Sequence, residues 1–400
     1  MASGQTTKAA LEGVEMSEQP GPPEPEPSAA AAWRQGTAAA VSEVLRGVVQ
    51  EESRRAEGRS RVYELLWRHL EQATLGGKHF RGRLVLETYF GLGGADGSAA
   101  ARLGAAFELL HAGFLVHDDL IDHDTLRRGH PNLAAGMSAA AAAAGAGPPA
   151  AQHLAEASAV LAGDLAIALA HRLTATVAAS DPVRTALTDL LWRTVFVSVA
   201  GELDDVAAAH GLWEVSTEKA LTTAAEKTAF YSFQAPLRAG AVLAEAPERV
   251  QGELDRVGRA LGKAFQLADD LLGVFAPESV TGKSQLSDLR EGKATTLILY
   301  ARELPVWDSI GSAVGRADLD PAMAQAVRRE LATSDAPRRV DAQARLELAV
   351  ARRHLMAIPA LEPVIDVVMP AWSMVEAQLS MATGYVTALA ATADDHQTEA

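Results

Sequence analysis

Apolar side chains recur every three or four residues along most of the chain from about residue 31 onward, with polar side chains between them. This period is the one expected of amphipathic α-helices, whereas the strict alternation typical of half-buried strands is almost missing. Breakers such as the Gly76–Gly77 pair, Pro247 and Pro277 separate the apolar stretches. The pattern predicts a large all-α bundle with helices near residues 35–55, 59–72, 80–92, 98–123, 153–178, 182–208, 216–242, 248–275, 293–303, 321–332, 340–356 and 362–392.

Two stretches depart from this pattern. Residues 1–30 include a Pro- and Glu-rich tract that cannot bury enough apolar surface to offset its ordering entropy. We therefore expect a disordered tail there, followed by one all-α domain over residues 31–395. Residues 134–151 are rich in alanine, glycine and proline, and we expect them to form an insertion of unassigned role.

The composition narrows the class of protein. The chain has 400 residues, of which 48% are hydrophobic and only 5% aromatic, which suits a large helical core. Its 36 Lys and Arg against 51 Asp and Glu leave a net charge of −15, which argues against a nucleic-acid partner. Because the chain has no cysteine, disulfide frameworks, thiol nucleophiles, zinc ribbons and iron–sulfur centres are excluded.

Neither a secretory leader nor a membrane span is predicted. The start of the chain lacks a basic segment followed by an apolar one. Apolar windows such as residues 190–201 and 264–275 are too short to cross a bilayer and carry charges. We expect a cytoplasmic protein without stable membrane insertion.

One predicted helix ends in a cluster of carboxylates. Asp118 and Asp122 lie roughly 40° apart on a helical wheel, one turn from each other, and Asp119 is close enough to converge on the same ion. Three such carboxylates repel one another unless a cation holds them together. Hard oxygen ligands of this kind suit Mg²⁺, especially Mg²⁺ that also carries phosphate oxygens.

A second predicted helix carries another acidic pair, Asp269 and Asp270, within an otherwise apolar stretch. Taken alone, either acidic segment could be a solvated helix face. Two of them on helices that look buried instead predict facing clusters inside a bundle, which is how multi-metal sites are built in such folds.

Basic residues lie beside glycines at several points of the chain, in arrangements typical of phosphate binding. Each of them alone could be an ordinary solvated side chain. They occur in Gly76-Gly77-Lys78-His-Phe-Arg81, in Arg127-Arg128-Gly129, in Gly282-Lys283 and in Asp288-Leu-Arg-Glu-Gly292-Lys293; a Lys227-Thr228 pair completes the set.

The order of these motifs resembles that of the trans-isoprenyl diphosphate synthases, also called polyprenyl synthetases. The resemblance covers about residues 70–300 and includes Gly-Gly-Lys-x-x-Arg, Asp-Asp-x-x-Asp, Gly163-Asp164, Lys-Thr and Phe-Gln-x-x-Asp-Asp, each in register. It implies the isoprenoid synthase fold, a single helical bundle around a central cavity with two facing Asp-rich helices.

The resemblance also implies a role for individual residues. The positions that hold about three Mg²⁺ ions on the diphosphate of an allylic substrate are Asp118, Asp119, Asp122, Asp269 and Asp270. Cations that contact the same diphosphate, and complete the catalytic set, are Arg127, Lys227 and Lys283. The pocket for the diphosphate of isopentenyl diphosphate comprises Lys78, Arg81, His111 and Arg128. Further substrate-binding candidates are Thr228, Gln266 and Lys293.

The implied activity is a Mg²⁺-dependent prenyl transfer. Isopentenyl diphosphate would condense with dimethylallyl, geranyl or farnesyl diphosphate to a short all-trans product. In the family, the residues four and five before the first Asp form the floor of the elongation pocket, and here these are Phe114 and Gly113. One bulky and one minimal residue favour a C20 product, geranylgeranyl diphosphate as in bacterial synthases of that type, with C15 as the alternative.

Two other readings of the same residues stay open at this point. A class I terpene cyclase shares the bundle and an Asp-rich motif, but it has no use for a second diphosphate pocket at Lys78, Arg81 and His111. A noncatalytic subunit of a heteromeric synthase would not need the intact acidic and basic sets. The resemblance also implies a homodimer, for which the sequence indicates no interface.

Overall fold

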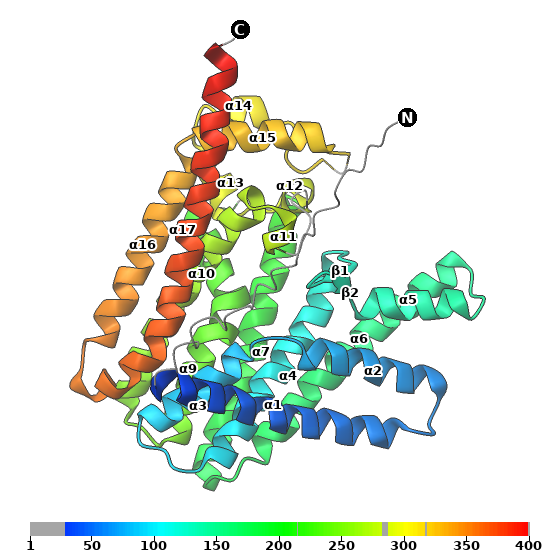
Figure 1. Cartoon of the computed structure of the whole chain (residues 1–400), viewed down its shortest axis with the longest axis vertical. Coiled ribbons are helices and arrows are strands. Elements are labelled where there is room, and N and C mark those ends of the chain that lie inside the picture. The colour runs from blue at the N-terminus through cyan, green and yellow to red at the C-terminus, as the bar shows by residue number, and fades with distance from the viewer. Residues whose placement is uncertain (1–28, 214, 282–286, 317, 399–400) are drawn as a thin grey trace, which may run out of the picture.

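The computed structural model describes residues 29–213, 215–281, 287–316 and 318–398, and they are almost entirely helical (Figure 1). The all-α prediction is therefore confirmed. The first half of the chain contains α1 (Ala29–Ala56), α2 (Arg61–Leu75), α3 (Phe80–Gly91), α4 (Gly97–Ile121), α5 (Leu133–Ala143), α6 (Pro148–Ala175) and α7 (Asp181–Ala209). Between α4 and α5 lies a two-stranded antiparallel hairpin of β1 (Leu126–Arg127) and β2 (His130–Pro131), with Arg127 opposite His130.

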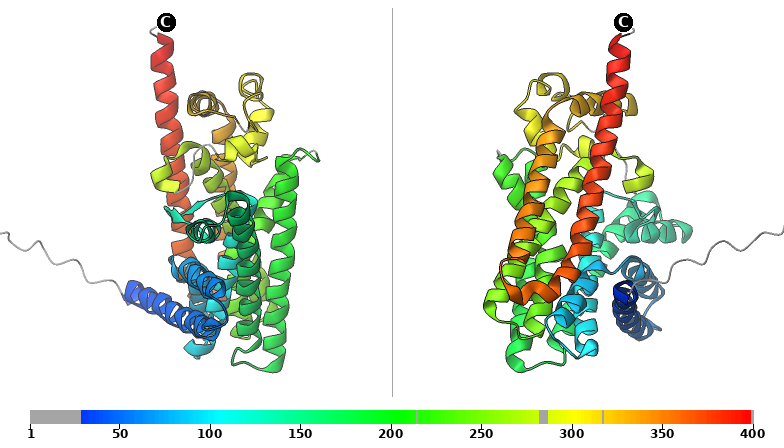
Figure 2. Two further views of the ribbon diagram at one scale, coloured as in Figure 1. Left: turned by 90° about the vertical axis from the view of Figure 1, so that its right-hand side faces the viewer. Right: turned by 60° about the vertical axis from the view of Figure 1, so that its left-hand side comes forward.

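The second half contains one long π-helix between two short α-helices. Its elements are α8 (Thr217–Ala224), the π-helix η1 (Ala225–Gln234), α9 (Ala235–Leu243), α10 (Glu248–Phe275), α11 (Glu278–Thr281), α12 (Ser287–Glu291), α13 (Thr296–Arg302), α14 (Trp307–Ile310), α15 (Pro321–Thr333), α16 (Ala336–Leu355), the 3₁₀ turn η2 (Pro359–Leu361) and α17 (Glu362–Thr398). In all three views α17 runs along the molecule and projects past the end where α14 and α15 lie (Figures 1 and 2).

Polar caps and prolines set where several helices begin. The Ser60 hydroxyl accepts from the backbone N–H of Tyr63 at the start of α2, and Asp96 accepts from two N–H groups at the start of α4. Such side chains satisfy N–H groups that the helix itself leaves unpaired. Pro148 and Pro182 lie in the first turns of α6 and α7, where a missing N–H costs nothing.

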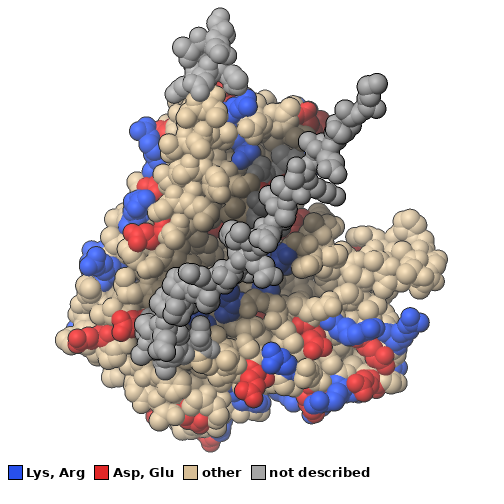
Figure 3. Space-filling model, in the orientation of Figure 1, with Lys and Arg blue, Asp and Glu red and all other residues tan. Residues whose placement is uncertain are grey.

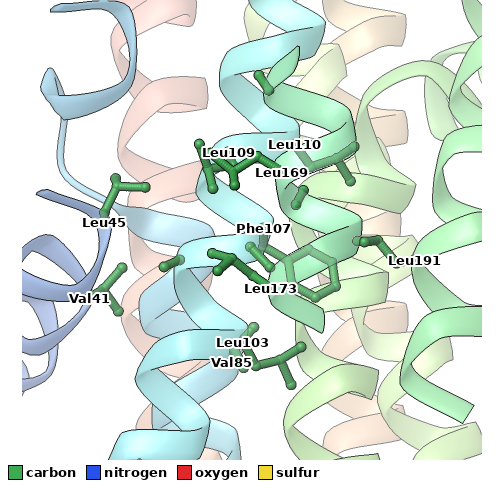
Figure 4. Packing of buried hydrophobic residues seen from close by; sticks show 14 of the residues in the cluster. Val41, Leu45, Val85, Leu103, Phe107, Leu109, Leu110, Leu169, Leu173 and Leu191 are labelled. Atoms are coloured by element: carbon green, nitrogen blue, oxygen red, sulfur yellow. The ribbon is translucent and has the colours of Figure 1, made fainter. Parts of the chain in front are cut away.

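Helix α4 lies at the centre of the first half, packed against α1, α3 and α6. Figure 4 shows the core around it, where leucines of α4 and α6 surround Phe107 and meet Val41 and Leu45 of α1. The crossing of α3 and α4 is close because it is made by glycines: a Cβ on Gly104 would lie 2.8 Å from the carbonyl oxygen of Gly82. In the second half, α10 packs against η1, α16 and α17. Thus α4 and α10, which carry the two acidic clusters, are each fixed by several neighbours.

The structure differs from the predicted elements at several points, among them the short helices α11, α12 and α14, which lie outside the predicted ranges. The expected insertion over residues 134–151 contains helix α5, and α6 begins at Pro148, because alanine is the strongest helix former and proline is tolerated in a first turn. The helix expected over 216–242 is divided into α8, η1 and α9. The β1–β2 hairpin was not predicted, since two residues per strand leave no periodicity. The expected tail over residues 1–30 lies outside the described residues except for its last two, which begin α1.

Two of the described helices are long and apolar enough to cross a membrane, judged by length and composition alone. One is α4, whose apolar window is 78% buried inside the protein, and the other is α6, at 44%. In Figure 3 the arm that contains α5 shows no charged side chain on the visible face, whereas charges of both signs are scattered over the body.

Candidate active site

A cavity of about 520 Å³ lies between the end of α4, the hairpin, α7, α8, η1, α10 and the start of α13. It brings together residues that are up to 215 positions apart in sequence, from Arg81 to Thr296. The predicted site residues that line it are Arg81, Asp118, Asp122, Arg127, Lys227, Thr228, Gln266, Asp269, Asp270 and Lys293. Lys283 and the side chain of Asp288 lie outside the described residues.

The first acidic cluster occupies the C-terminal end of α4. Asp118 and Asp119 belong to its last turn, whereas Asp122 is the residue after the helix, and its N–H donates to the carbonyl oxygen of Asp118 at 2.8 Å. Asp122 is therefore a capping residue that follows α4, whereas the predicted helix over residues 98–123 included it. A helix C-terminus carries partial negative charge, so the three carboxylates and the helix end together attract cations.

Each carboxylate of this cluster has a different basic partner. The Nε of Arg127 donates to Asp119 at 2.8 Å, Lys227 lies 3.6 Å from Asp118, and Lys293 donates to Asp122 at 2.9 Å. The hairpin brings Arg127 back over the helix it follows. Burial raises the pKa of Asp119 above its usual value, although Arg127 acts in the opposite direction.

Lys227 is held by three carboxylates. Its Nζ lies 2.7 Å from Asp205 and 3.1 Å from Glu202, both on α7, in addition to Asp118 on α4. Burial alone would lower the pKa of Lys227, but the three carboxylates outweigh it and raise that pKa well above the usual range. Lys227 therefore carries a full positive charge at neutral pH. Gly201 of α7 allows the Lys227 backbone to approach closely, since a Cβ at this position would collide with the Lys227 backbone nitrogen.

The second acidic cluster lies on the last turns of α10. Asp269 is exposed, whereas Asp270 is only 8% exposed and accepts a hydrogen bond from the side-chain amide of Gln266 at 2.9 Å. Both aspartates line the cavity together with Asp118 and Asp122. The two acid-bearing helices thus face one another, as the resemblance implies.

The donor chemistry of the site fits a hard divalent cation. Carboxylate oxygens from both walls line one cavity, and such oxygens are the ligands that Mg²⁺ prefers. Among the described residues, however, no three acidic or histidine side chains form a ready-made ligand group. Lysine and arginine side chains balance the acidic charge of the α4 cluster, so an entering ion would have to compete with them.

A second basic group lies beside the cavity, around the start of α3. The Arg128 guanidinium donates to the carbonyl oxygen of Gly76, and a Cβ on Gly76 or Gly77 would collide with that guanidinium. The glycine pair thus lets the hairpin and the loop that carries Lys78 meet. Lys78 is exposed at this point, and Arg81, three residues on, reaches the cavity.

His111 lies on α4 behind this basic group. Burial lowers its pKa well below the usual value, and the positive charges of Arg81, Arg128 and Arg127 lower it further. The imidazole is therefore neutral at physiological pH. It stacks on the ring of Tyr231, with the two ring centroids 5.8 Å apart.

The two residues predicted to form the floor have different surroundings. Phe114 is half-buried and meets the ring of Tyr231 edge-on, with centroids 5.1 Å apart; Tyr231 itself lines the cavity. Gly113 is buried in the α4–α6 contact, where a Cβ would lie 3.0 Å from the carbonyl oxygen of Gly163. Gly113 thus serves helix packing, and the floor role of both residues stays a prediction.

Sequence reasoning missed several residues of the site. Glu202 and Asp205 of α7 and Tyr231 and Ser232 of η1 contact the predicted cations, and the exposed Trp213 lies at the cavity. The sequence did carry a signal for Glu202 and Asp205, because two acidic residues three positions apart in an apolar part of a helix suggest a buried basic partner. No local pattern marks Ser232, whose partner is 151 residues away.

Comparison with known proteins agrees with this geometry. The chain belongs to the polyprenyl synthetase family, whose sequence profile matches residues 63–309. It is 34% identical over 233 residues to the geranylgeranyl diphosphate synthase of Sulfolobus acidocaldarius, covering 58% of this chain and 64% of that one. It is 32% identical over 261 residues to the (2E,6E)-farnesyl diphosphate synthase of Mycobacterium tuberculosis, covering 62% of this chain and 67% of that one.

The fold is likewise shared with a solved structure. The geranylgeranyl pyrophosphate synthase of Corynebacterium glutamicum, complexed with isoprenyl diphosphate and magnesium, superposes with a TM-score of 0.76 at 25% identity, over 87% of this chain and 98% of that one. The present chain spans about two thirds of the length of the two enzymes matched by sequence.

Proposed function

We propose that this protein is a Mg²⁺-dependent prenyltransferase that condenses isopentenyl diphosphate with an allylic diphosphate to a short all-trans prenyl diphosphate. The observation that carries the proposal is the arrangement around one cavity: two facing acidic helix ends, with Arg127, Lys227 and Lys293 on one side and Lys78, Arg81 and Arg128 on the other. Two separate basic groups suit two diphosphates. A terpene cyclase, which binds one diphosphate, has no use for the second group.

The chain's own residues would bind and orient both substrates. Arg127 and Lys227, which line the cavity, would contact the allylic diphosphate, and Arg81 and Arg128 would contact the diphosphate of isopentenyl diphosphate. Bound Mg²⁺, held by Asp118, Asp122 and Asp269, would supply positive charge to the departing diphosphate. The neutral His111 can donate a hydrogen bond without adding charge.

The proposed reaction is balanced without a protein base. The allylic C1–O bond breaks, and its electron pair leaves with the diphosphate. The double bond of isopentenyl diphosphate then attacks the allylic C1, and a proton leaves C2 of the former isopentenyl unit to the released diphosphate. Stabilisation of the leaving group is the main contribution asked of the protein.

We further propose geranylgeranyl diphosphate as the main product, with farnesyl diphosphate as the alternative. The aromatic pair of Phe114 and Tyr231 supports a short chain because it places two rings below the acidic end of α4. The relatives' names include both product lengths.

The test is an incubation of the full chain with labelled isopentenyl diphosphate, each allylic primer and Mg²⁺, followed by chain-length analysis. Prenyl diphosphates of 15 or 20 carbons are expected, and Asp118→Asn should lower turnover by about a hundredfold or more. Cyclised hydrocarbon made from an allylic diphosphate alone, or full turnover of Asp118→Asn, would overturn the proposal.

We also propose a homodimer formed through α7. Trp192, Phe196, Val199 and Leu203 follow one another at helical spacing and are 60%, 64%, 55% and 68% exposed. They expose on the order of 500 Å² of side-chain surface, the larger part of the about 800 Å² that each partner of a standard interface buries. The stripe itself carries no charge, so two copies of an acidic chain can meet there around a twofold axis.

A further inference from the structure

Arg81 lines the cavity with an unusual set of partners. Its Nη2 donates to the hydroxyl of Ser232 at 2.7 Å, and its guanidinium lies 4.8 Å from the centre of the Tyr231 ring. Its Nε is buried without a hydrogen-bond partner among the described residues. Within the same part of the chain, no carboxylate lies at ion-pair distance from Arg81, in contrast to Arg127, Lys227 and Lys293. Arg81 is therefore oriented by neutral groups, and its charge stays available to an anion.

The two partners of Arg81 are themselves fixed by their surroundings. Ser232 is 2% exposed. The Tyr231 ring is stacked on the His111 ring and meets the Phe114 ring edge-on, so two side chains of α4 hold it. The Ser232 hydroxyl and the Tyr231 ring are thus each held in place by buried surroundings.

The backbone of η1 is held just as closely. A Cβ on Gly201 of α7 would collide with Lys227, one on Gly262 of α10 with Ala229, and one on Gly258 of α10 with Gln234. Helices on two sides thus fix the π-helix along most of its length. π-Helical turns are rare and are frequently found at functional sites.

One rigid segment therefore serves both basic groups. Near its start, η1 places Lys227 against Asp118, and one turn later it places Tyr231 and Ser232 against Arg81. A guanidinium held by a fixed hydroxyl and a fixed ring face loses little conformational freedom when an anion binds, which favours affinity.

We propose that Tyr231 and Ser232 are positioning residues that hold the Arg81 guanidinium ready for the diphosphate of isopentenyl diphosphate. This inference rests on the proposed function, in which Arg81 contacts that diphosphate. It predicts that loss of either residue lowers the affinity for isopentenyl diphosphate, and that loss of the Ser232 hydroxyl does so without changing the affinity for the allylic substrate. A merely structural role would instead affect both substrates alike.

The experiment measures kcat and both KM values for Ser232→Ala, Tyr231→Leu and Tyr231→Phe, together with binding of isopentenyl diphosphate by calorimetry without allylic substrate. Ser232→Ala and Tyr231→Leu should weaken isopentenyl diphosphate binding and raise its KM roughly tenfold, while the allylic KM of Ser232→Ala stays within about twofold. Tyr231→Phe keeps the ring face that Arg81 contacts and should bind isopentenyl diphosphate with wild-type affinity. Ser198→Ala, another buried serine that does not contact Arg81, is the matched control.

A double-mutant cycle decides whether the effect passes through Arg81. In an Arg81→Lys background, which keeps the charge but not the planar donor group, Ser232→Ala should have little further effect on isopentenyl diphosphate binding. If Ser232→Ala weakens isopentenyl diphosphate binding equally in the wild-type and Arg81→Lys backgrounds, or raises the KM values of both substrates equally, the inference is overturned. The proposed function still stands in that case, provided that the wild-type chain turns over. A wild-type chain that neither binds isopentenyl diphosphate nor makes product would overturn both.

Discussion

Lys293 donates a hydrogen bond of 2.9 Å to Asp122 from the far side of the cavity, 171 residues further along the chain. The lysine comes from the loop before α13, and the aspartate caps α4. Lys293 also lies 3.1 Å from Glu291. Because Arg127 and Lys227 stand in the same relation to Asp119 and Asp118, the acidic end of α4 is held together by the protein's own cations.

This pairing predicts that metal and lysine substitute for one another. Lys293→Gln removes one cation from the cluster, so the melting temperature in a chelator should fall by about 1–2 °C, as expected for a loss of roughly 1–2 kcal/mol in a chain of 400 residues. Added Mg²⁺ should reverse most of the fall, since the ion supplies the missing charge. The measurement is differential scanning fluorimetry with and without Mg²⁺.

Lys263→Gln is the matched control, because Lys263 pairs with Glu347 at 3.6 Å on α16 and does not line the cavity. Its melting temperature should change equally in chelator and in Mg²⁺. An equal, Mg²⁺-independent fall for Lys293→Gln would contradict the exchange of lysine for metal.

Phe114 predicts the length of the product. Phe114→Ala removes the ring that backs Tyr231, and the space should let the chain grow beyond the wild-type product by one or more five-carbon units. Chromatography of the labelled products after removal of the diphosphate measures this shift. Phe90→Ala, a substitution of another half-buried phenylalanine on α3, should leave the product unchanged. Products of unaltered length from Phe114→Ala would rule out the floor role of this residue.

The apolar stripe on α7 predicts the oligomeric state. In Figure 2 α7 runs along the outer edge of the molecule, where a second copy has access to it. Phe196→Glu should place like charges across the twofold axis and shift the chain from dimer to monomer in sedimentation velocity at micromolar concentration. The control is Leu346→Glu. Leu346 lies on the exposed face of α16 and is 57% exposed, so this substitution should leave the dimer intact. A wild-type monomer, or a dimer that tolerates Phe196→Glu, would contradict the interface.

Much of this architecture follows from local sequence signals. Long apolar periods mark α4, α6, α7 and α10 within a few residues, since each helix must bury one face. The acidic residues at the ends of α4 and α10 were likewise visible, because carboxylates are rare in apolar stretches. What local patterns cannot reveal is which distant residues meet them.

The pairings that complete the site depend on tertiary packing. Ser232 meets Arg81, and Glu202 meets Lys227, only because glycines let α7, η1 and α10 approach closely. The π-helix itself leaves no mark in the apolar period, because its ten residues continue the helical stretch from α8 into α9 without a break. Asp122 is a local example. The sequence predicts that it continues the helix, but α4 ends at Ile121, so the angle between Asp118 and Asp122 is not that of an ideal helical turn.

His111 predicts how stability responds to pH. Its pKa in the folded protein lies well below the value of about 6.5 expected in the unfolded chain, because the imidazole is buried and Arg81, Arg128 and Arg127 are close. Below pH 6.5 the unfolded state therefore binds a proton that the folded state does not, and the free energy of unfolding should fall as the pH drops from 7 toward 5.

His111→Gln removes this titration, so its urea-unfolding free energy should depend less steeply on pH over that range. His130→Gln, which replaces an exposed histidine on the hairpin, is the control variant. Identical slopes for His111→Gln and the wild type would show that the buried imidazole does not contribute to acid sensitivity.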